Sequence, residues 1–409
     1  MTQPTEHLAF KAALARGLVS RRGFMAGMGG LGVAGALAGC GVKGRNPGAR
    51  GAAATTPTAK AAEDLSASEK VINWSNWPEY IDVDDKTQKR PTLDAFTKKF
   101  GIKVNYTEDY NDNDEFYAKV RPLLADSKDT GRDVWCSTDW MVARLIRQGY
   151  AQRLDLTNIP NHKNIEDSLV TVEFDPGRLY SMPWQSGFAG IAYNPKATGG
   201  KKVESIDQLL TDPALKGRVT LLTEMRDTVG LVMLAMGKKL ETFTEADYMA
   251  AIDELKKAKD SGQIKGWTGN EYTKPLASGD TAACVAWTGD VVQLQADNPA
   301  LGYVLPSTGC TLWSDNFVIP AMAKHKKNAE VLINYYYDPE VMAQVVDYVN
   351  YISPVRDTKQ ILEKADPAVA QNPLIFPDDK TLSRAHVFRG LTSAEETKFN
   401  AAFSDLTAS

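Results

Sequence analysis

The sequence is poor in the residues that build metal centres and catalytic sites. Its 409 residues include 4 cysteines and 4 histidines, which are too scattered for an evident metal cluster. It contains no Gly-x-Ser-x-Gly elbow, no His-Glu-x-x-His pair and no phosphate-binding loop. His325 and His386 have no partner pattern that indicates catalysis. These gaps predict a protein that is not an enzyme and that uses neither a metal ion nor a cofactor.

An excess of basic charge is also lacking. The net charge of -4 argues against nucleic acid as a partner, because nucleic-acid-binding proteins need a basic face. The same balance is compatible with a cationic ligand. Hydrophobic residues make up 43% of the chain and charged residues 24%, as in ordinary soluble proteins. Because the chain is longer than one ordinary domain, two folded lobes are predicted.

The amino-terminal region lacks an apolar run long enough for a comfortable membrane span. It carries a twin arginine, Arg21-Arg22, followed by a small-residue apolar run that ends near Cys40. This pattern resembles the export signals of bacterial lipoproteins, in which the cysteine is lipidated. We predict a twin-arginine-type lipoprotein signal over 1–40 and a flexible tether over 41–68. The protein is then exported and lipid-anchored to the outer face of the cytoplasmic membrane or in the periplasm.

After the tether, short apolar strands alternate with helices. This alternation predicts α/β lobes, each with a parallel sheet and helices on its faces. The amino-terminal lobe is predicted to comprise 69–186 and 314–358, and the carboxyl-terminal lobe 187–313 and 359–409. Two lobes joined by more than one crossing leave a ligand cleft between them. Such a protein closes on its ligand by a hinge motion.

One short stretch, Leu312–Asn316, indicates the chemistry of that ligand. In an extended segment, residues i and i+2 point to the same side, so Trp313 and Asp315 can face one cavity. An indole face attracts a cation, and a carboxylate accepts its N–H hydrogen bonds. The pair therefore suits an organic ammonium ion. The alternative is a core tryptophan beside a turn-forming aspartate.

Several motifs occur in one order along the folded part of the chain. They are Asn76–Tyr80, Asp133–Trp140, Leu221–Asp227, Trp287, Leu312–Asn316 and Tyr351–Pro354. Together they resemble the substrate-binding proteins of polyamine (spermidine/putrescine) ABC transporters. The resemblance implies a two-lobed periplasmic-binding-protein type II fold. It also implies a solute-binding protein that captures putrescine or spermidine and delivers it to an ABC permease and its ATPase.

The resemblance implies binding roles for the residues at matching positions. Aromatic side chains cover the methylene groups of a polyamine. Acids pair with its ammonium groups, because a buried unpaired ammonium is very costly. The candidate residues are Trp77, Glu79, Tyr80, Thr138, Asp139, Trp140, Glu224, Asp227, Trp287, Trp313, Asp315 and Tyr351.

Three departures from the family pattern leave the exact polyamine open. Asp139 stands where the family often has tyrosine, so both Asp139 and Trp140 are candidates for that position. The loop before Arg226 is about one residue shorter than in the spermidine-binding form, which leaves the match of Glu224 open. Phe388 stands where the family form has a glutamine that contacts the ligand.

Several candidates also have a purely structural interpretation. Asp227 and Asp139 can cap the helices that follow them, and Trp287 can be a core residue. Glu79 can be a solvated loop acid. Asp290, which follows Trp287-Thr288-Gly289, is predicted to cap the next helix and is left out of the site.

Two cysteines allow a disulfide. Cys284 and Cys310 lie three residues before Trp287 and Trp313 respectively. If the two segments are neighbours, the cysteines can pair, which an exported protein permits. The alternative is two buried thiols.

Other functions remain compatible with the sequence. The same fold can bind another organic cation or an amino-acid derivative, because one aromatic-plus-acid site does not fix the number of amines. An exported hydrolase or transferase is disfavoured by the missing motifs. A sensor that passes ligand occupancy to a membrane receptor uses the same cleft.

Overall fold

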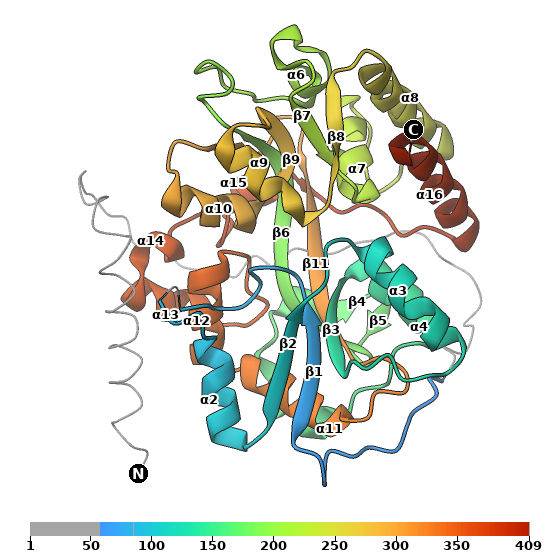
Figure 1. Ribbon diagram of the computed structural model, residues 1–409, viewed down its shortest axis with the longest axis vertical. Helices are drawn as coiled ribbons and strands as arrows, with labels where there is room; N and C mark the ends of the chain where they lie inside the picture. Colours follow the sequence, from blue (N-terminus) through green and yellow to red (C-terminus); the bar gives the residue numbers. More distant parts are fainter. Residues whose placement is uncertain (1–57, 85, 409) are drawn as a thin grey trace.

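Two α/β lobes are stacked along the long axis of the molecule (Figure 1). The structure is a computed structural model that describes residues 58–84 and 86–408. Its main strands are β1 (Val71–Asn76), β2 (Lys103–Glu108), β3 (Val134–Thr138), β6 (Ser181–Tyr193), β7 (Val219–Leu222), β8 (Ile264–Thr268), β9 (Ala283–Trp287), β10 (Gly302–Val304), β11 (Cys310–Val318) and β12 (Ala385–His386). The short strands β4 (Thr171–Val172) and β5 (Asp175–Pro176) form a separate pair.

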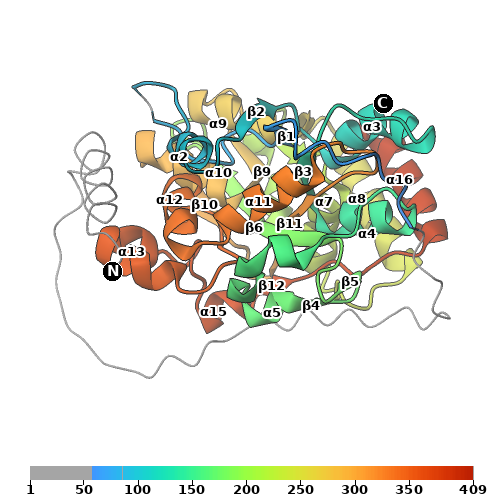
Figure 2. The ribbon, with the colours of Figure 1, turned by 90° about the horizontal axis from the view of Figure 1, so that it is seen from below.

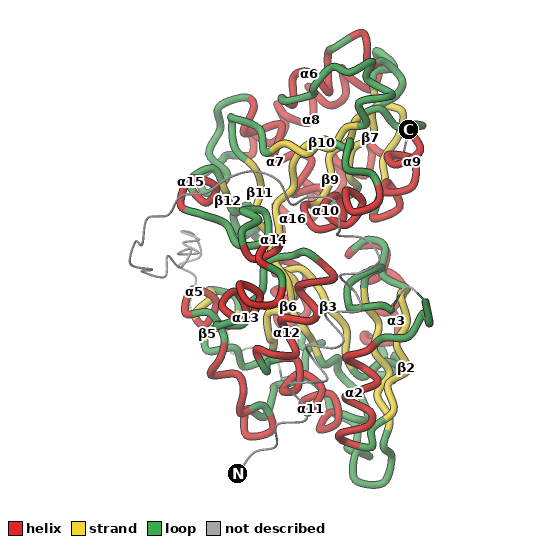
Figure 3. The backbone as a smooth tube through the Cα atoms, turned by 90° about the vertical axis from the view of Figure 1, so that its left-hand side faces the viewer, coloured by secondary structure: helices red, strands yellow, loops and turns green. Residues whose placement is uncertain are grey.

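The helices cover the faces of the sheet, as Figure 3 shows. In the first half of the chain they are α2 (Pro91–Phe100), α3 (Asn113–Ala125), α4 (Asp139–Arg147), α5 (Asp167–Val170), α6 (Ile206–Thr211) and α7 (Met225–Ala235). In the second half they are α8 (Glu245–Asp260), α9 (Thr273–Ser278), α10 (Thr288–Asp297), α11 (Lys326–Tyr336), α12 (Pro339–Val349), α13 (Thr358–Ala365), α14 (Pro367–Ala370), α15 (Asp379–Leu382) and α16 (Ser393–Ala408).

The strands of both lobes belong to one sheet. Its order is β2-β1-β3-β11-β6-β9-β7-β8, with β10 beside β6 and β12 beside β11. In the first lobe β1 is parallel to both β2 and β3, and in the second β7 is parallel to both β8 and β9. These parallel sets confirm the alternation read from the sequence. The long strands β6 and β11 lie between the two sets, antiparallel to each other, and they are also antiparallel to β9 and β3 respectively.

Local sequence signals explain where several helices begin and end. Pro91 occupies the first turn of α2, and Gly101 ends it in the left-handed region at φ 67°. Helix α8 begins with a capping box, in which Thr244 and Asp247 satisfy each other's backbone amides. Strand β6 is buried at all thirteen positions, which requires the nearly continuous run of apolar and small residues that the sequence supplies.

Strands β6 and β11 carry the chain between the lobes (Figure 1). Residues 181–189 of β6 pair with residues 311–318 of β11, and residues 189–193 of β6 pair with β9 of the second lobe. The pairing of β6 with β11 shifts register between Asp315 and Asn316. Such an irregularity bends the strand and redirects its side chains.

The predicted tether is too long at its carboxyl end. Its last residues dock on the first lobe, where the amide of Leu65 donates to the carbonyl of Lys324 at 2.7 Å. The Ser66 hydroxyl accepts from the amide of Asn328 at 3.1 Å. Leu65 and Ser66 thus form hydrogen bonds with backbone groups of the first lobe, so this segment belongs to the folded body. The predicted signal, Cys40 and the tether before residue 58 lie outside the described residues.

The disulfide between Cys284 and Cys310 does not form, and both cysteines are buried thiols. Strand β6 lies between β9, which carries Cys284, and β11, which carries Cys310. Strands two positions apart in a sheet are separated by roughly 10 Å, whereas a disulfide needs Cα atoms within about 7 Å. The two segments are therefore close in the fold but are not adjacent.

The carboxyl-terminal tail divides between two places. Helix α13 packs against α12, which the prediction assigns to the amino-terminal lobe, whereas α16 packs against α8 of the other lobe. The boundaries after residues 186, 313 and 358 therefore remain predictions. Within the described residues, no helix is both long and apolar enough to cross a bilayer.

Candidate ligand-binding site

Strand β11 places a buried carboxylate between the two lobes. Asp315 is 4% exposed. Its Oδ2 accepts from the Tyr80 hydroxyl at 2.8 Å, and its Oδ1 accepts from the Thr138 hydroxyl at 2.7 Å. Burial raises the pKa of Asp315 to about 7, and the two hydroxyl donors offset part of that effect. Near neutral pH this carboxyl is therefore poised between its two protonation states.

Aromatic rings from both lobes surround this carboxylate. Trp313 lies 5.4 Å from Tyr351, and Tyr351 lies 5.4 Å from Tyr80, measured between ring centroids. Trp287 of the second lobe lies 6.4 Å from Trp313. Because Asp315 binds Tyr80 and Trp313 contacts Tyr351, both strand residues face one cluster. The expectation from alternation along the strand is thus confirmed.

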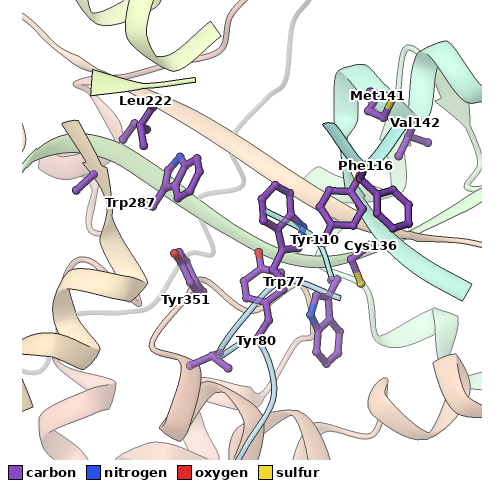
Figure 4. Packing of buried hydrophobic residues seen from close by; sticks show 14 of the residues in the cluster. Trp77, Tyr80, Tyr110, Phe116, Cys136, Met141, Val142, Leu222, Trp287 and Tyr351 are labelled. Atoms are coloured by element: carbon purple, nitrogen blue, oxygen red, sulfur yellow. The ribbon is translucent and has the colours of Figure 1, made fainter. Parts of the chain in front are cut away.

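The aromatic cluster also joins the first loop of the chain to the second lobe. Trp77, in the loop after β1, lies 6.1 Å from Trp287 and 4.4 Å from Tyr110. Figure 4 shows Trp77, Tyr80, Tyr351 and Trp287 close to one another between the lobes. All four are buried. Their edge-to-face contacts form an apolar wall of the kind that covers methylene groups or a cation.

Asp227 is a second buried acid, contributed by α7 of the second lobe. Its Oδ2 accepts from the Trp287 indole nitrogen at 2.8 Å, and its Oδ1 accepts from the Thr311 hydroxyl at 2.5 Å. Burial raises its pKa. The interpretation of Asp227 as a helix cap is wrong, because Glu224 is the N-cap of α7 and accepts from the amide of Arg226. Trp287 is both a core residue and the partner of this acid.

Asp290 is the acid that sequence reasoning missed. The prediction that it caps α10 is wrong, since Trp287 is the N-cap and Asp290 is the third residue of the helix, within its first turn. Its carboxylate accepts from the hydroxyls of Tyr351 at 2.7 Å and Tyr272 at 2.6 Å, and from the Asn270 amide at 2.7 Å. Burial raises the pKa of Asp290 to about 6. The sequence signal for Asp290 is its position three residues after Trp287, and that position also fits a helix cap.

Glu224 and Glu79 lie at opposite edges of the cluster. Glu224 faces the first lobe, where the Asn113 amide donates to it at 3.5 Å, and burial raises its pKa to about 8. Glu79 is exposed and accepts from the Tyr348 hydroxyl at 2.6 Å. Glu79 adopts φ 55°, an unusual backbone conformation for a residue other than glycine. It is therefore a rim acid, as its structural interpretation predicted.

The neighbouring candidates Asp139 and Trp140 have other partners. Asp139 accepts from the Asn316 amide at 2.7 Å, and Asn316 in turn accepts from the buried Arg178. Thr138, not Asp139, occupies the N-cap of α4. The Trp140 ring stacks on the guanidinium of Arg226 at 3.8 Å. Adjacent residues at a helix start point in different directions, so only Thr138 of this trio contacts Asp315.

Phe388 has neighbours that do not belong to the aromatic cluster. Its ring lies 4.8 Å from Phe243 and 5.9 Å from the Arg226 guanidinium. The residue at the position of the family's glutamine thus packs within the second lobe. A phenylalanine ring offers no amide to a ligand at this position.

The lobes are in direct contact around the cluster, so the conformation is closed. The Thr223 hydroxyl donates to Asp112 at 2.7 Å, and the amide of Asn270 donates to the Asn111 side chain at 3.1 Å. On the other side, the Gln293 amide donates to the carbonyl of Val349 at 2.9 Å. Hinge closure of this kind sequesters a ligand from water. The fold and the site together define a binding protein of the two-lobed, hinge-closing class.

Comparison with known proteins agrees with this class. Residues 92–377 match the family of bacterial extracellular solute-binding proteins, so the chain belongs to this family. The spermidine/putrescine-binding periplasmic protein of Escherichia coli K12 is 29% identical over 335 residues, which cover 82% of this chain and 90% of that protein. The putrescine-binding periplasmic protein PotF of the same organism is 29% identical over 76% of this chain and 85% of its own.

A solved structure confirms the fold. The spermidine/putrescine ABC transporter substrate-binding protein PotD of Streptococcus pneumoniae is 26% identical and superposes with a TM-score of 0.66. The match covers 83% of this chain and 99% of that protein. The predicted two-lobed fold of the periplasmic-binding type is therefore confirmed.

Proposed function

We propose that this chain is an exported, lipid-anchored solute-binding protein that captures a polyamine, putrescine or spermidine. It delivers the ligand to an ABC permease and its ATPase, and it catalyses no reaction. The observation that carries the proposal is Asp315, whose two oxygens accept from neutral hydroxyl groups while aromatic rings line its surroundings. An ammonium group provides the positive charge that stabilises such a buried carboxylate.

The remaining acids suit a ligand with more than one amine. Asp227 and Asp290 belong to the second lobe, whereas Asp315 lies on the strand that connects the lobes. A polyamine alternates methylene and ammonium groups, so its charges can reach separate carboxylates while aromatic rings cover the carbons between them. The names of the relatives from Escherichia coli and Streptococcus pneumoniae support the same ligand class. The anchor at Cys40 rests on the sequence signal.

The experiment that tests the proposal is calorimetric titration of the purified protein with putrescine, spermidine and spermine. Binding of one of these amines in the micromolar range or tighter is expected. Titration with an uncharged diol of matched length is the control, because it fills the aromatic walls without pairing with the acids. No binding of any polyamine contradicts the assignment of the cargo and leaves the fold unaffected.

Affinity for a polyamine is expected to rise with pH between about 6 and 8. Burial raises the pKa of Asp290 to about 6, of Asp315 to about 7 and of Glu224 to about 8. An ammonium pairs only with the ionised carboxylate, so binding must release the protons that these groups hold. Calorimetry in two buffers of different ionisation enthalpy measures this release. A proton release of zero across the range contradicts the burial of these acids against the ligand.

The same pKa shifts predict a larger thermal effect of the ligand at high pH. Because the folded pKa values lie above those of the unfolded chain, the folded state binds more protons between about pH 4 and pH 8. These groups therefore stabilise the ligand-free protein at low pH, and that stability is lost as the pH rises. The ligand offsets the loss, so the shift in melting temperature should be greater at pH 8 than at pH 6.

Gly269 is expected to be required for full closure. A Cβ atom at Gly269 would lie 2.5 Å from the backbone oxygen of Asn111, which belongs to the other lobe. Since backbone cannot rotate away, Gly269→Ala should weaken polyamine binding by about tenfold, the effect of roughly 1.4 kcal/mol of overpacking. Gly266→Ala on the same strand-and-loop segment is the matched control, because its Cβ meets nothing within 4 Å. Equal affinities for the two variants contradict the closed arrangement.

A further inference from the structure

Helix α16 is fixed to the second lobe. The ring of Phe399 stacks on Tyr248 of α8 at 3.9 Å between centroids, and the Tyr248 hydroxyl donates to the carbonyl of Phe399 at 3.0 Å. Further along, the Lys259 ammonium donates to the carbonyl of Leu406 at 2.7 Å. Figure 1 and Figure 2 show α16 beside α8 and next to α3 and α4 of the first lobe. The helix therefore moves with one lobe and touches the other.

Glu396 of α16 binds guanidinium groups from both lobes. Its Oε1 accepts from Arg144 at 3.0 Å, and its Oε2 accepts from Arg147 at 3.0 Å. Both arginines lie on α4, which packs against β3 and β11 of the first lobe. Oε1 also accepts from Arg226 of α7 in the second lobe at 3.5 Å. The Glu396 side chain is only 11% exposed, so these charge-assisted bonds are shielded from solvent.

A stacking contact runs beside this carboxylate across the same interface. The Arg226 guanidinium lies 3.8 Å above the Trp140 ring of the first lobe, and the Arg144 guanidinium lies 4.8 Å from that ring. Trp140 thus receives a cation from each lobe. Arg144 also pairs with Asp114 of its own lobe at 2.7 Å, and Arg226 pairs with Glu224 of its own lobe at 3.9 Å. Glu396 differs from these acids because it binds arginines of both lobes at once.

We propose that Glu396 is a positioning residue for ligand binding, which holds the lobes closed by linking α16 to α4. This inference rests on one part of the proposed function, namely that the lobes close on a ligand. Glu396 bonds to arginines and lies on the terminal helix, whereas the acids of the aromatic cluster lie on β11, α7 and α10. It acts through the equilibrium between open and closed forms. The apparent affinity falls with the fraction of closed protein.

The neighbouring glutamate provides a matched control. Glu395 forms an ion pair of similar length, 2.6 Å, with Arg389, which also donates to the carbonyl of Phe243 in the second lobe. Glu395→Gln therefore removes an ion pair within one lobe, on the same helix and one residue away. Glu396→Gln removes the ion pairs between the lobes. The two variants have the same chemical change and differ in what the lost charge connects.

We call the ion pairs of Glu396 with Arg144, Arg147 and Arg226 the latch. Hydrogen–deuterium exchange of the ligand-free protein tests it directly. The amide of Asn270 is the reporter, because it donates to Asn111 across the lobes and is released when they separate. Glu396→Gln is expected to speed its exchange by about tenfold, whereas Glu395→Gln leaves it unchanged. Arg147→Gln, at a half-exposed position, should act in the same direction as Glu396→Gln. Unchanged exchange in both Glu396→Gln and Arg147→Gln, or equal acceleration in Glu395→Gln, overturns the proposal.

Binding kinetics give a second readout that a merely structural role does not move. The ligand enters the open form, so loss of the latch should raise the association rate, because more of the protein is open, and should raise the dissociation rate by about tenfold. Urea unfolding of the ligand-free variants checks that each remains folded. The exchange experiment uses no ligand, so it stands even if putrescine and spermidine do not bind. The latch and the choice of cargo therefore fail independently.

Discussion

Asp315→Asn is expected to weaken polyamine binding by about a hundredfold or more. Removing one member of a buried charge pair typically costs about 2–5 kcal/mol, and each 1.4 kcal/mol is roughly tenfold in affinity. Asparagine keeps the shape, but its single oxygen can accept from only one of the Tyr80 and Thr138 hydroxyls. Its amide nitrogen must donate to the other hydroxyl, so the variant loses the charge that an ammonium needs together with one acceptor. Calorimetric titration with the best wild-type ligand measures the effect.

The ligand-free Asp315→Asn variant is expected to gain stability at pH 8. Burial disfavours the ionised carboxylate, and the amide removes that cost. Asp253→Asn, on the exposed face of α8, is the control and should change neither affinity nor stability. Retention of wild-type affinity in Asp315→Asn would require the ammonium to sit elsewhere.

Asp290→Asn is expected to weaken binding of the same polyamine by about thirtyfold, from roughly 2 kcal/mol of lost charge pairing. The effect is smaller than at Asp315 because Asp290, with the lower pKa, already has three donors from Tyr272, Tyr351 and Asn270. An asparagine oxygen can keep accepting from some of them. The melting temperature of the ligand-free variant should therefore stay close to that of the wild type.

The double variant distinguishes two ways of using these acids. If one ligand spans Asp315 and Asp290, the two substitutions lose separate charge pairs, and their effects on the binding free energy add. If a single ammonium is shared by both acids, the second substitution costs much less than the first. If Asp290→Asn instead lowers the melting temperature and leaves the affinity unchanged, Asp290 only supports packing.

Much of the fold was predictable because its signals are local. Apolar strands alternating with helices, the proline that starts α2 and the glycine that ends it all act within a few residues. The pairing of Trp313 with Asp315 on one face of β11 follows from the two-residue repeat of any strand. These features needed no knowledge of distant parts of the chain.

The errors arose where a residue's partner is far away in sequence. Asp290 looked like a helix cap until Tyr351, 61 residues later, was found to donate to it. The cysteine pair failed because β6 inserts between β9 and β11, an order that no local pattern contains. Asp139 and Trp140 are equivalent candidates in the sequence, yet their side chains diverge at the start of α4, toward Asn316 and Arg226 respectively.

The sequence by itself determined the class of this protein, because the alternation of strands and helices and the ordered motifs of aromatic and acidic residues already indicate two α/β lobes of the solute-binding type. Periodicity, composition and the order of short motifs are properties of the chain alone. Only the tertiary structure decided which acids share the site and how the lobes are held together. Asp290 and Glu396 acquire their roles from hydroxyls and guanidinium groups that folding brings to them. Burial between those partners, not position in the chain, sets their chemistry.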